Sequence, residues 1–216
     1  MKVSNQVALS AVGAVVLGLS VTPAQALTLK TFTNESEFAA IASSLNTETF
    51  NDATLSEAKN HVLDDFAIES DMTWSRIVDG DETANVDGST FLKLKSYRSN
   101  TAATFNFNNP INVFGFDWVN TDKNDTLELI VGSQNFVFGL PEQRGFFGVI
   151  ATEGSFSSVQ LSDTEGGGYL LDGGIDNIRY GNISPQAVPT PAAILPNLVL
   201  FGLNALRRRG DRQTDH

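Results

Sequence analysis

Apolar and polar side chains alternate with a period of two along most of the chain between residues 27 and 183. The alternation is clearest in segments 72–78, 103–107 and 126–131, and it is typical of half-buried antiparallel strands. The pattern predicts further strands at residues 111–119, 135–140, 146–150, 157–161 and 174–180. Turn residues separate these segments at Asp79-Gly80, Asp87-Gly88, 108–110, Gly132-Ser133, Gly154 and 166–168. We therefore expect an all-β antiparallel sandwich of the jelly-roll type.

One short helix is predicted near the start of this region. Asn34 has the chemistry of an N-cap, and Glu37 follows it three residues later. The apolar stripe of the helix consists of Phe38, Ile41, Ala42 and Leu45.

The last thirty residues have a three-part order. A motif comes first, made of Pro189, Thr190, Pro191 and Ala192. Residues 188–206 carry no charge and, at 19 residues, are long enough for a helix to cross a membrane. A basic cluster follows, made of Arg207, Arg208 and Arg209, which is typical of the cytoplasmic flank of a span. The alternative is a buried C-terminal helix, which Pro191 and Pro196 disfavour.

This tail resembles the PEP-CTERM sorting domain, in the variant with Pro-Thr-Pro-Ala in place of Pro-Glu-Pro. The resemblance implies recognition and processing by an exosortase-type membrane protease of a bacterium. It also implies a place in the cell envelope or the extracellular polysaccharide matrix.

The N-terminus predicts export independently. Lys2 precedes an uncharged segment at 7–21, and Ala24 and Ala26 form an A-x-A cleavage site for signal peptidase. An N-terminal membrane anchor is the alternative. The expected division is a signal peptide at 1–26, a β-sandwich at 27–183, a linker at 184–188, the sorting motif with its span and basic cluster at 189–210, and a cytoplasmic tail at 211–216.

Charge and composition exclude several classes of function. Of the chain's 25 acidic and 14 basic residues, two acids and five bases lie outside residues 27–187, so that region carries a net charge of −14. Such a surface repels nucleic acid and anionic lipid, and we expect no nucleic-acid partner. The chain has no cysteine, and His61 is the only histidine before the tail, which disfavours zinc and thiol chemistry.

Four aromatic residues are candidates for stacking against sugar rings, namely Trp74, Tyr97, Trp118 and Tyr169. Trp118 shares one face of a predicted strand with Phe114 and Phe116, which favours a place in the core. Trp74 is ambiguous, and Tyr97 is expected on the surface.

The predicted last strand carries Asp176. Its Ile-Asp-Asn-Ile-x-Tyr pattern resembles the last strand of jelly-roll carbohydrate-binding modules, and Phe50-Asn51-Asp52 resembles their starting element. The resemblance implies a structural Ca²⁺ held by Asp52 and Asp176. In the alternative, Asp176 bonds backbone groups at a sheet edge. The acidic loop of Asp122, Asn124 and Asp125 suits a hard cation too, although its composition is that of an ordinary turn.

No catalytic motif stands out. Gly-x-Ser-x-Gly is absent, the 166–168 glycines lack a following lysine, and His61 has no recognisable motif around it. We therefore expect no enzyme. The resemblance of the tail implies an exported surface or matrix protein with a structural or adhesive role. The alternative is a calcium-stabilised carbohydrate-binding module. A secreted hydrolase would need two facing acids in a pocket.

Overall fold

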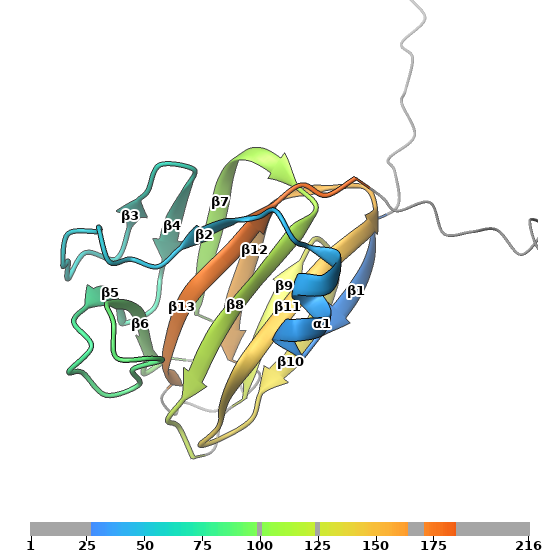
Figure 1. Ribbon diagram of the computed structural model, residues 1–216. Helices are drawn as coiled ribbons and strands as arrows, with labels where there is room; N and C mark the ends of the chain where they lie inside the picture. The colour runs from blue at the N-terminus through green and yellow to red at the C-terminus, as the bar shows by residue number, and fades with distance from the viewer. Residues whose placement is uncertain (1–26, 99–100, 124–125, 164–170, 185–216) are drawn as a thin grey trace, which may run out of the picture.

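The computed structural model describes residues 27–98, 101–123, 126–163 and 171–184. In this part of the chain, two antiparallel sheets pack face to face and one short helix lies against one of them (Figure 1). The predicted all-β sandwich with a single N-terminal helix is therefore confirmed.

Sheet A runs in the order β1-β11-β8-β13-β6-β5, and β2 pairs with the far end of β13. Its described strands are β1 (Thr28–Phe32), β2 (Asn46–Glu48), β5 (Trp74–Val78), β6 (Phe91–Ser96), β8 (Val113–Asn120), β11 (Arg144–Glu153) and β13 (Leu171–Gly181).

Sheet B runs in the order β10-β9-β12-β7-β4-β3. Its described strands are β3 (His61–Val62), β4 (Phe66–Ser70), β7 (Ala102–Ile111), β9 (Leu127–Val131), β10 (Gln134–Gly139) and β12 (Phe156–Asp163).

The eight strands β6 to β13 have the connectivity of a jelly roll. Sheet A contains the order β6-β13-β8-β11, and sheet B contains the order β7-β12-β9-β10. The chain therefore crosses repeatedly from one sheet to the other, as two Greek keys require. This crossing places the inner residues of consecutive strands in one shared core.

The core between the sheets is rich in phenylalanine. Phe105 of β7 and Phe114 of β8 come from opposite sheets, and their ring centroids are 5.8 Å apart. Trp118 is also in this core, with 6% of its surface exposed, which confirms its predicted position. Residues that alternate with these core positions along sheet A face outward.

The helix α1 (Glu35–Ile41) covers part of the outer face of sheet A. Asn34 caps it as predicted, because its side chain accepts hydrogen bonds from the backbone N–H groups of Ser36 and Glu37. Phe38 is fully buried against Phe32 and Phe146. The helix ends before Leu45, so the predicted stripe extends too far by one turn.

Glycine makes the close approach of α1 possible. A Cβ at Gly148 of β11 would lie 2.7 Å from the Phe38 ring. A Cβ at Gly115 of β8 would lie 2.9 Å from the same ring. The helix can therefore dock only where both strands lack side chains.

The predicted turn at 108–110 is wrong, because these residues belong to β7. Pro110 cannot donate a hydrogen bond to a neighbouring strand. It is tolerated because the pairing with β4 extends only to Phe107, and the pairing with β12 has an irregularity between Phe156 and Ser158. Strands β1, β2, β3, β4 and β6 are additional to those predicted from the sequence.

The 79–90 loop, which joins β5 to β6, folds back over the outer face of sheet A. A Cβ at Gly174 of β13 would lie only 1.9 Å from the carbonyl oxygen of Ala84, so the loop can approach β13 this closely only over a glycine. The Lys93 ammonium of β6 binds Glu82 and Thr83 of the loop at 3.1 and 2.9 Å. The loop and α1 therefore flank the exposed middle of this face.

Candidate functional site

The outer face of sheet A gathers charged and aromatic side chains. Leu92 and Leu94 of β6 point into the core, so the lysines that alternate with them face outward. The same alternation places basic residues on the outer face of β5, β6, β11 and β13. These residues are Arg76, Lys93, Lys95, Arg144 and Arg179. The face thus has a concentration of cations although the domain as a whole is acidic.

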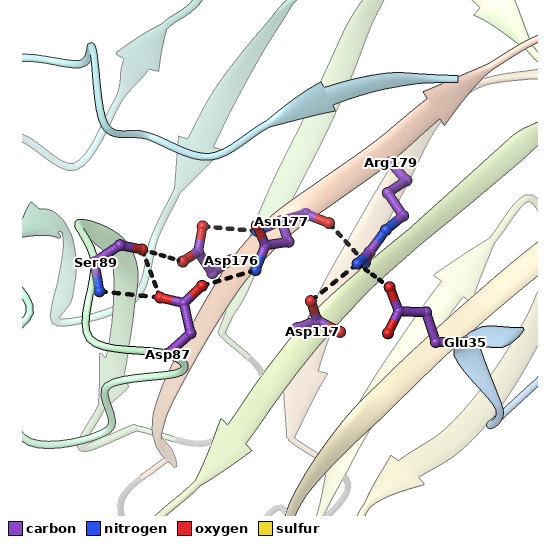
Figure 2. A network of polar contacts seen from close by, with 7 residues as sticks. All are labelled: Glu35, Asp87, Ser89, Asp117, Asp176, Asn177 and Arg179. Carbon is purple, nitrogen blue, oxygen red and sulfur yellow. Dashed lines mark hydrogen bonds and ion pairs between the residues drawn. The ribbon is translucent and has the colours of Figure 1, made fainter. Parts of the chain in front are cut away.

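Asp176 is fully buried beneath the 79–90 loop (Figure 2). Its Oδ2 lies 2.9 Å from the hydroxyl oxygen of Ser89, and its Oδ1 accepts a hydrogen bond of 2.7 Å from the backbone N–H of Asn177. The pairing of β13 with β8 shifts between Asp176 and Arg179, and Asn177 has a left-handed backbone with a φ of 49°. This irregularity turns the Asn177 side chain toward Asp87, which it binds at 3.2 Å.

The hydroxyl of Ser89 is also 2.6 Å from Oδ1 of Asp87, so two carboxyl groups face one hydroxyl. A hydroxyl carries a single proton and can donate to only one of them. Burial raises the pKa of Asp176 to about 6, with Asp87 and Asp117 adding repulsion. The hydrogen bonds from Ser89 lower the pKa of Asp87. A proton on Asp176 therefore completes a chain in which Asp176 donates to Ser89 and Ser89 donates to Asp87.

Arg179 connects β13 to α1 and β8. Its guanidinium forms an ion pair with Glu35 and another with Asp117, the latter at 3.2 Å. Burial raises the pKa of Asp117, and the nearby guanidinium opposes this shift. The network in Figure 2 thus joins the 79–90 loop, two central strands and the helix across the outer face.

A cavity of about 350 Å³ opens beside this network. Its polar lining includes Asp87, Asp117, Arg144 and Asn177, and Phe146 contributes an aromatic wall. Glu35 also lines the cavity, so the described lining has three carboxylates against the single guanidinium of Arg144 and is net acidic.

An aromatic pair lies at the β5 edge of the same face. Trp74 is half-buried, Tyr97 is 47% exposed, and their ring centroids are 6.0 Å apart at an angle of 82°. The Lys95 ammonium lies 5.4 Å from the centroid of each ring and binds Asp172 at 2.7 Å. That hydrogen bond raises the pKa of Lys95, so the ammonium stays charged. We call Trp74, Tyr97, Lys95 and Asp172 the aromatic patch.

The sequence identified only part of this patch. The surface position of Tyr97 is confirmed, and Trp74 joins it, whereas Trp118 lies in the core. Tyr169 lies outside the described residues. Lys95 and Asp172 carried no sequence signal of their own, because their proximity to Trp74 arises from the pairing of β5, β6 and β13.

The structure shows no contact between Asp52 and Asp176. Asp52 is exposed in the wall of a cavity of about 420 Å³, together with Glu48 and His61. Both segments nonetheless contact the 79–90 loop. Asn51, next to Asp52, accepts a hydrogen bond of 3.3 Å from the backbone N–H of Thr90, and Asp176 faces Ser89. The described ranges hold no group of three or more histidine, aspartate or glutamate side chains that could bind a metal ion. The structural calcium therefore stays a prediction.

The other polar candidates have structural surroundings. His61 is buried, and its Nε2 donates a hydrogen bond of 2.9 Å to the carbonyl oxygen of Ser75, which fixes the ring against β5. The backbone N–H of Asp122 donates to the side-chain oxygen of Asn120 at 3.0 Å, as in an Asx turn. Asn124 and Asp125 lie outside the described residues.

The residues predicted for export and sorting also lie outside the described part of the chain. These are Ala24 and Ala26, the motif at 189–192 and the arginines at 207–209. Within the described ranges, no helix has the length and apolar character needed to cross a membrane.

Comparison with known proteins gives only distant likenesses. No family model and no curated protein matches the chain. Ten solved chains resemble it in structure. Two are variants of the family 29 carbohydrate-binding module CBM29-2, and each is 10% identical to this chain with a TM-score of 0.39. The first match covers 64% of this chain and 95% of the module. The second covers 68% of this chain and 99% of the module. A third is the catalytic unit of a GH87 alpha-1,3-glucanase from Streptomyces thermodiastaticus strain HF3-3, at 10% identity and a TM-score of 0.37, covering 68% of this chain and 28% of the glucanase. The neighbours thus include carbohydrate-binding β-sandwiches, and at these scores none assigns a family to the chain.

Proposed function

We propose that this chain is an exported carbohydrate-binding protein that contacts a polysaccharide through the aromatic patch. The observation that carries the proposal is the contact of half-buried Trp74 with exposed Tyr97 beside the Lys95–Asp172 ion pair. Sugar rings have apolar faces that stack on aromatic rings, and their hydroxyl groups bond to charged side chains nearby. The patch supplies both kinds of group on one rigid sheet face.

The geometry of the pair favours a single polysaccharide chain over a crystalline surface. Rings that cross at 82° form no flat platform, so they cannot lie together on one plane of packed sugars. The Arg76 guanidinium, 4.4 Å from the Trp74 centroid, holds that ring in place by a cation–π contact. A fixed ring loses little side-chain entropy when a ligand binds.

Export, tail anchoring and exosortase-type processing are the cellular part of the proposal. They rest on the signal segment and on the motif at 189–192, and the PEP-CTERM resemblance carries them. A surface protein that binds polysaccharide would act as an adhesin for the matrix. A structural calcium beneath the 79–90 loop would keep the fold rigid outside the cell.

Affinity electrophoresis of the purified protein tests the proposal. The gels would contain hydroxyethylcellulose, glucomannan, xyloglucan or dextran, and we expect at least one to retard the protein. Trp74→Ala and Tyr97→Ala should each weaken that retardation about fivefold or more, because each removes a stacking surface. Val137→Ala is the control, since Val137 is an exposed apolar residue of β10 in the other sheet. Equal retardation of all four proteins would refute the proposal.

A further inference from the structure

A third cavity lies where β2 begins and where β7 and β13 end. It has a volume of about 270 Å³, and its base is formed by Phe107, Ile111 and Tyr180. The three side chains are buried, and the rings of Phe107 and Tyr180 are 5.6 Å apart. The base is therefore apolar and partly aromatic.

The rim of this cavity is formed by polar side chains, and hydrogen bonds to the protein orient two of them, Asn46 and Asn182. The side-chain amide of Asn46 donates a hydrogen bond of 3.2 Å to Asp65. The side-chain amide of Asn182 donates one of 3.0 Å to the carbonyl oxygen of Pro110. A carboxylate and a carbonyl only accept hydrogen bonds, so the NH₂ group of each amide is engaged with the protein. The amide oxygens of Asn46 and Asn182 are left to accept hydrogen bonds from a ligand.

Two more rim groups have their whole hydrogen-bonding capacity available. The side chains of Ser44 and Asn109 line the cavity and form no hydrogen bond with any described residue. Asn109 has both a donor and an acceptor group, and Ser44 has a hydroxyl that can serve as either. The rim can thus bond several hydroxyl groups at once.

The cavity has little charge. Among the residues that the structure describes, no lysine, arginine or histidine lines it, and Asp65 is the one carboxylate. Oδ2 of Asp65 already accepts from the Tyr180 hydroxyl at 2.9 Å as well as from Asn46. Burial and the hydrogen bond to Asp65 raise the pKa of Tyr180, so the phenol is neutral. An apolar base and a rim whose one described carboxylate already bonds Asn46 and Tyr180 favour a neutral sugar over an anionic one.

We propose that this cavity binds a single neutral hexose residue, with one sugar face on the Phe107–Tyr180 base and the hydroxyls on the amide rim. The site is separate from the aromatic patch. Asp172 of the patch and Tyr180 of the cavity are eight residues apart on β13, which corresponds to roughly 25 Å along a strand. The inference does not depend on polysaccharide binding at Trp74.

NMR titration of the isotope-labelled full-length protein tests the site. The probes are methyl β-glucoside, methyl β-galactoside and methyl α-mannoside, with glycerol and glucuronate as comparisons. At least one hexoside should shift the backbone amide signals of Gly181 and Asn182, and Trp74→Ala should leave these shifts unchanged. A failure of all three hexosides would overturn the site, whatever the result with polysaccharides.

A matched pair of variants adds a second test. Asn109→Ala should weaken hexoside binding about two- to tenfold, the effect of one neutral hydrogen bond, without loss of stability. Asn106→Ala is the control, because Asn106 lies on the same strand, alternates with the core residues Phe105 and Phe107, and bonds no described residue through its side chain. Equal effects of the two substitutions would overturn the site. Shifts by glycerol or glucuronate as strong as those by the hexosides would overturn its assignment to a neutral sugar.

Discussion

The carboxyl groups of Asp87 and Asp176 face a single hydroxyl, that of Ser89, at 2.6 and 2.9 Å. No described lysine or arginine forms an ion pair with either carboxyl group. One of the two is therefore stabilised when it carries a proton, and the fully buried Asp176 is that group. Two predictions follow from this arrangement, one about pH and one about calcium.

The first prediction concerns the dependence of stability on pH. The pKa of Asp176 is about 6 in the folded protein and about 3.8 in the unfolded chain, so the folded state binds the proton more tightly between these values. Ionised Asp176 therefore destabilises the fold above pH 6, and this cost fades as the pH falls toward 4. Asp176→Asn removes the charge and retains an amide that can donate to Ser89. In the absence of calcium, we expect the variant to be more stable than wild type by about 1–3 kcal/mol at pH 7.5, with the difference shrinking at pH 4.5.

Urea unfolding of both proteins at the two pH values, with a chelator present, measures this difference. Other carboxyl groups titrate in wild type and variant alike, so only the change in the difference counts. A difference that is the same at pH 4.5 and pH 7.5 would contradict the raised pKa of Asp176.

The second prediction concerns calcium. A cation at Asp176 would offset the repulsion between this carboxyl group and that of Asp87. A ligand that binds only the folded state raises the free energy of unfolding, by about 2.7 kcal/mol when the ligand concentration is a hundred times the Kd. We expect calcium to raise the Tm of the wild-type protein relative to chelator and to leave the Tm of Asp176→Asn unchanged. Asp52→Asn tests the second predicted ligand. An unchanged wild-type Tm in calcium would remove the metal proposal.

The sequence predicted the fold class because the alternation of side chains survives in the folded strands. Segment 126–131 lies within or beside β9, and its core residues are Leu127, Leu129 and Val131, the ones that the parity selects. The same alternation is present in β6, where Leu92 and Leu94 flank Lys93. Lysine is disfavoured in strands, so the sequence did not predict a strand there.

The candidate site could be predicted only in part, because its residues meet through tertiary structure. The strand pattern of Trp118 identified a core residue, and a single strand was sufficient for that inference. The contact of Trp74 with Lys95 requires the register of β5 against β6. The burial of Asp176 requires the 79–90 loop to fold over β13, and no local pattern encodes that path.

The cap of α1 gives a prediction about the helix. Asn34 accepts two backbone hydrogen bonds in the first turn, so Asn34→Ala should destabilise the protein by about 0.5–2 kcal/mol. Asn34→Asp should retain most of the stability, because a carboxylate caps equally well and favours the helix N-terminus. Urea unfolding compares the three proteins. If the aspartate variant is as unstable as the alanine variant, capping is not the role of Asn34.

Gly174 gives the sharpest prediction about the 79–90 loop. A Cβ at this position would lie 1.9 Å from the carbonyl oxygen of Ala84 and 2.9 Å from the Phe91 ring, so Gly174→Ala forces the loop away from β13. We expect a loss of about 2–4 kcal/mol in the free energy of unfolding, together with faster proteolysis within the loop. Gly145→Ala is the control, because the nearest atom to its Cβ would be 3.3 Å away, on the Trp118 ring, and a smaller loss should follow. Displacement of the loop also exposes Asp176 to water, so its pKa should fall toward the ordinary value. A Gly174→Ala protein with wild-type stability and an unchanged Asp176 pKa would show that the loop does not depend on this close contact.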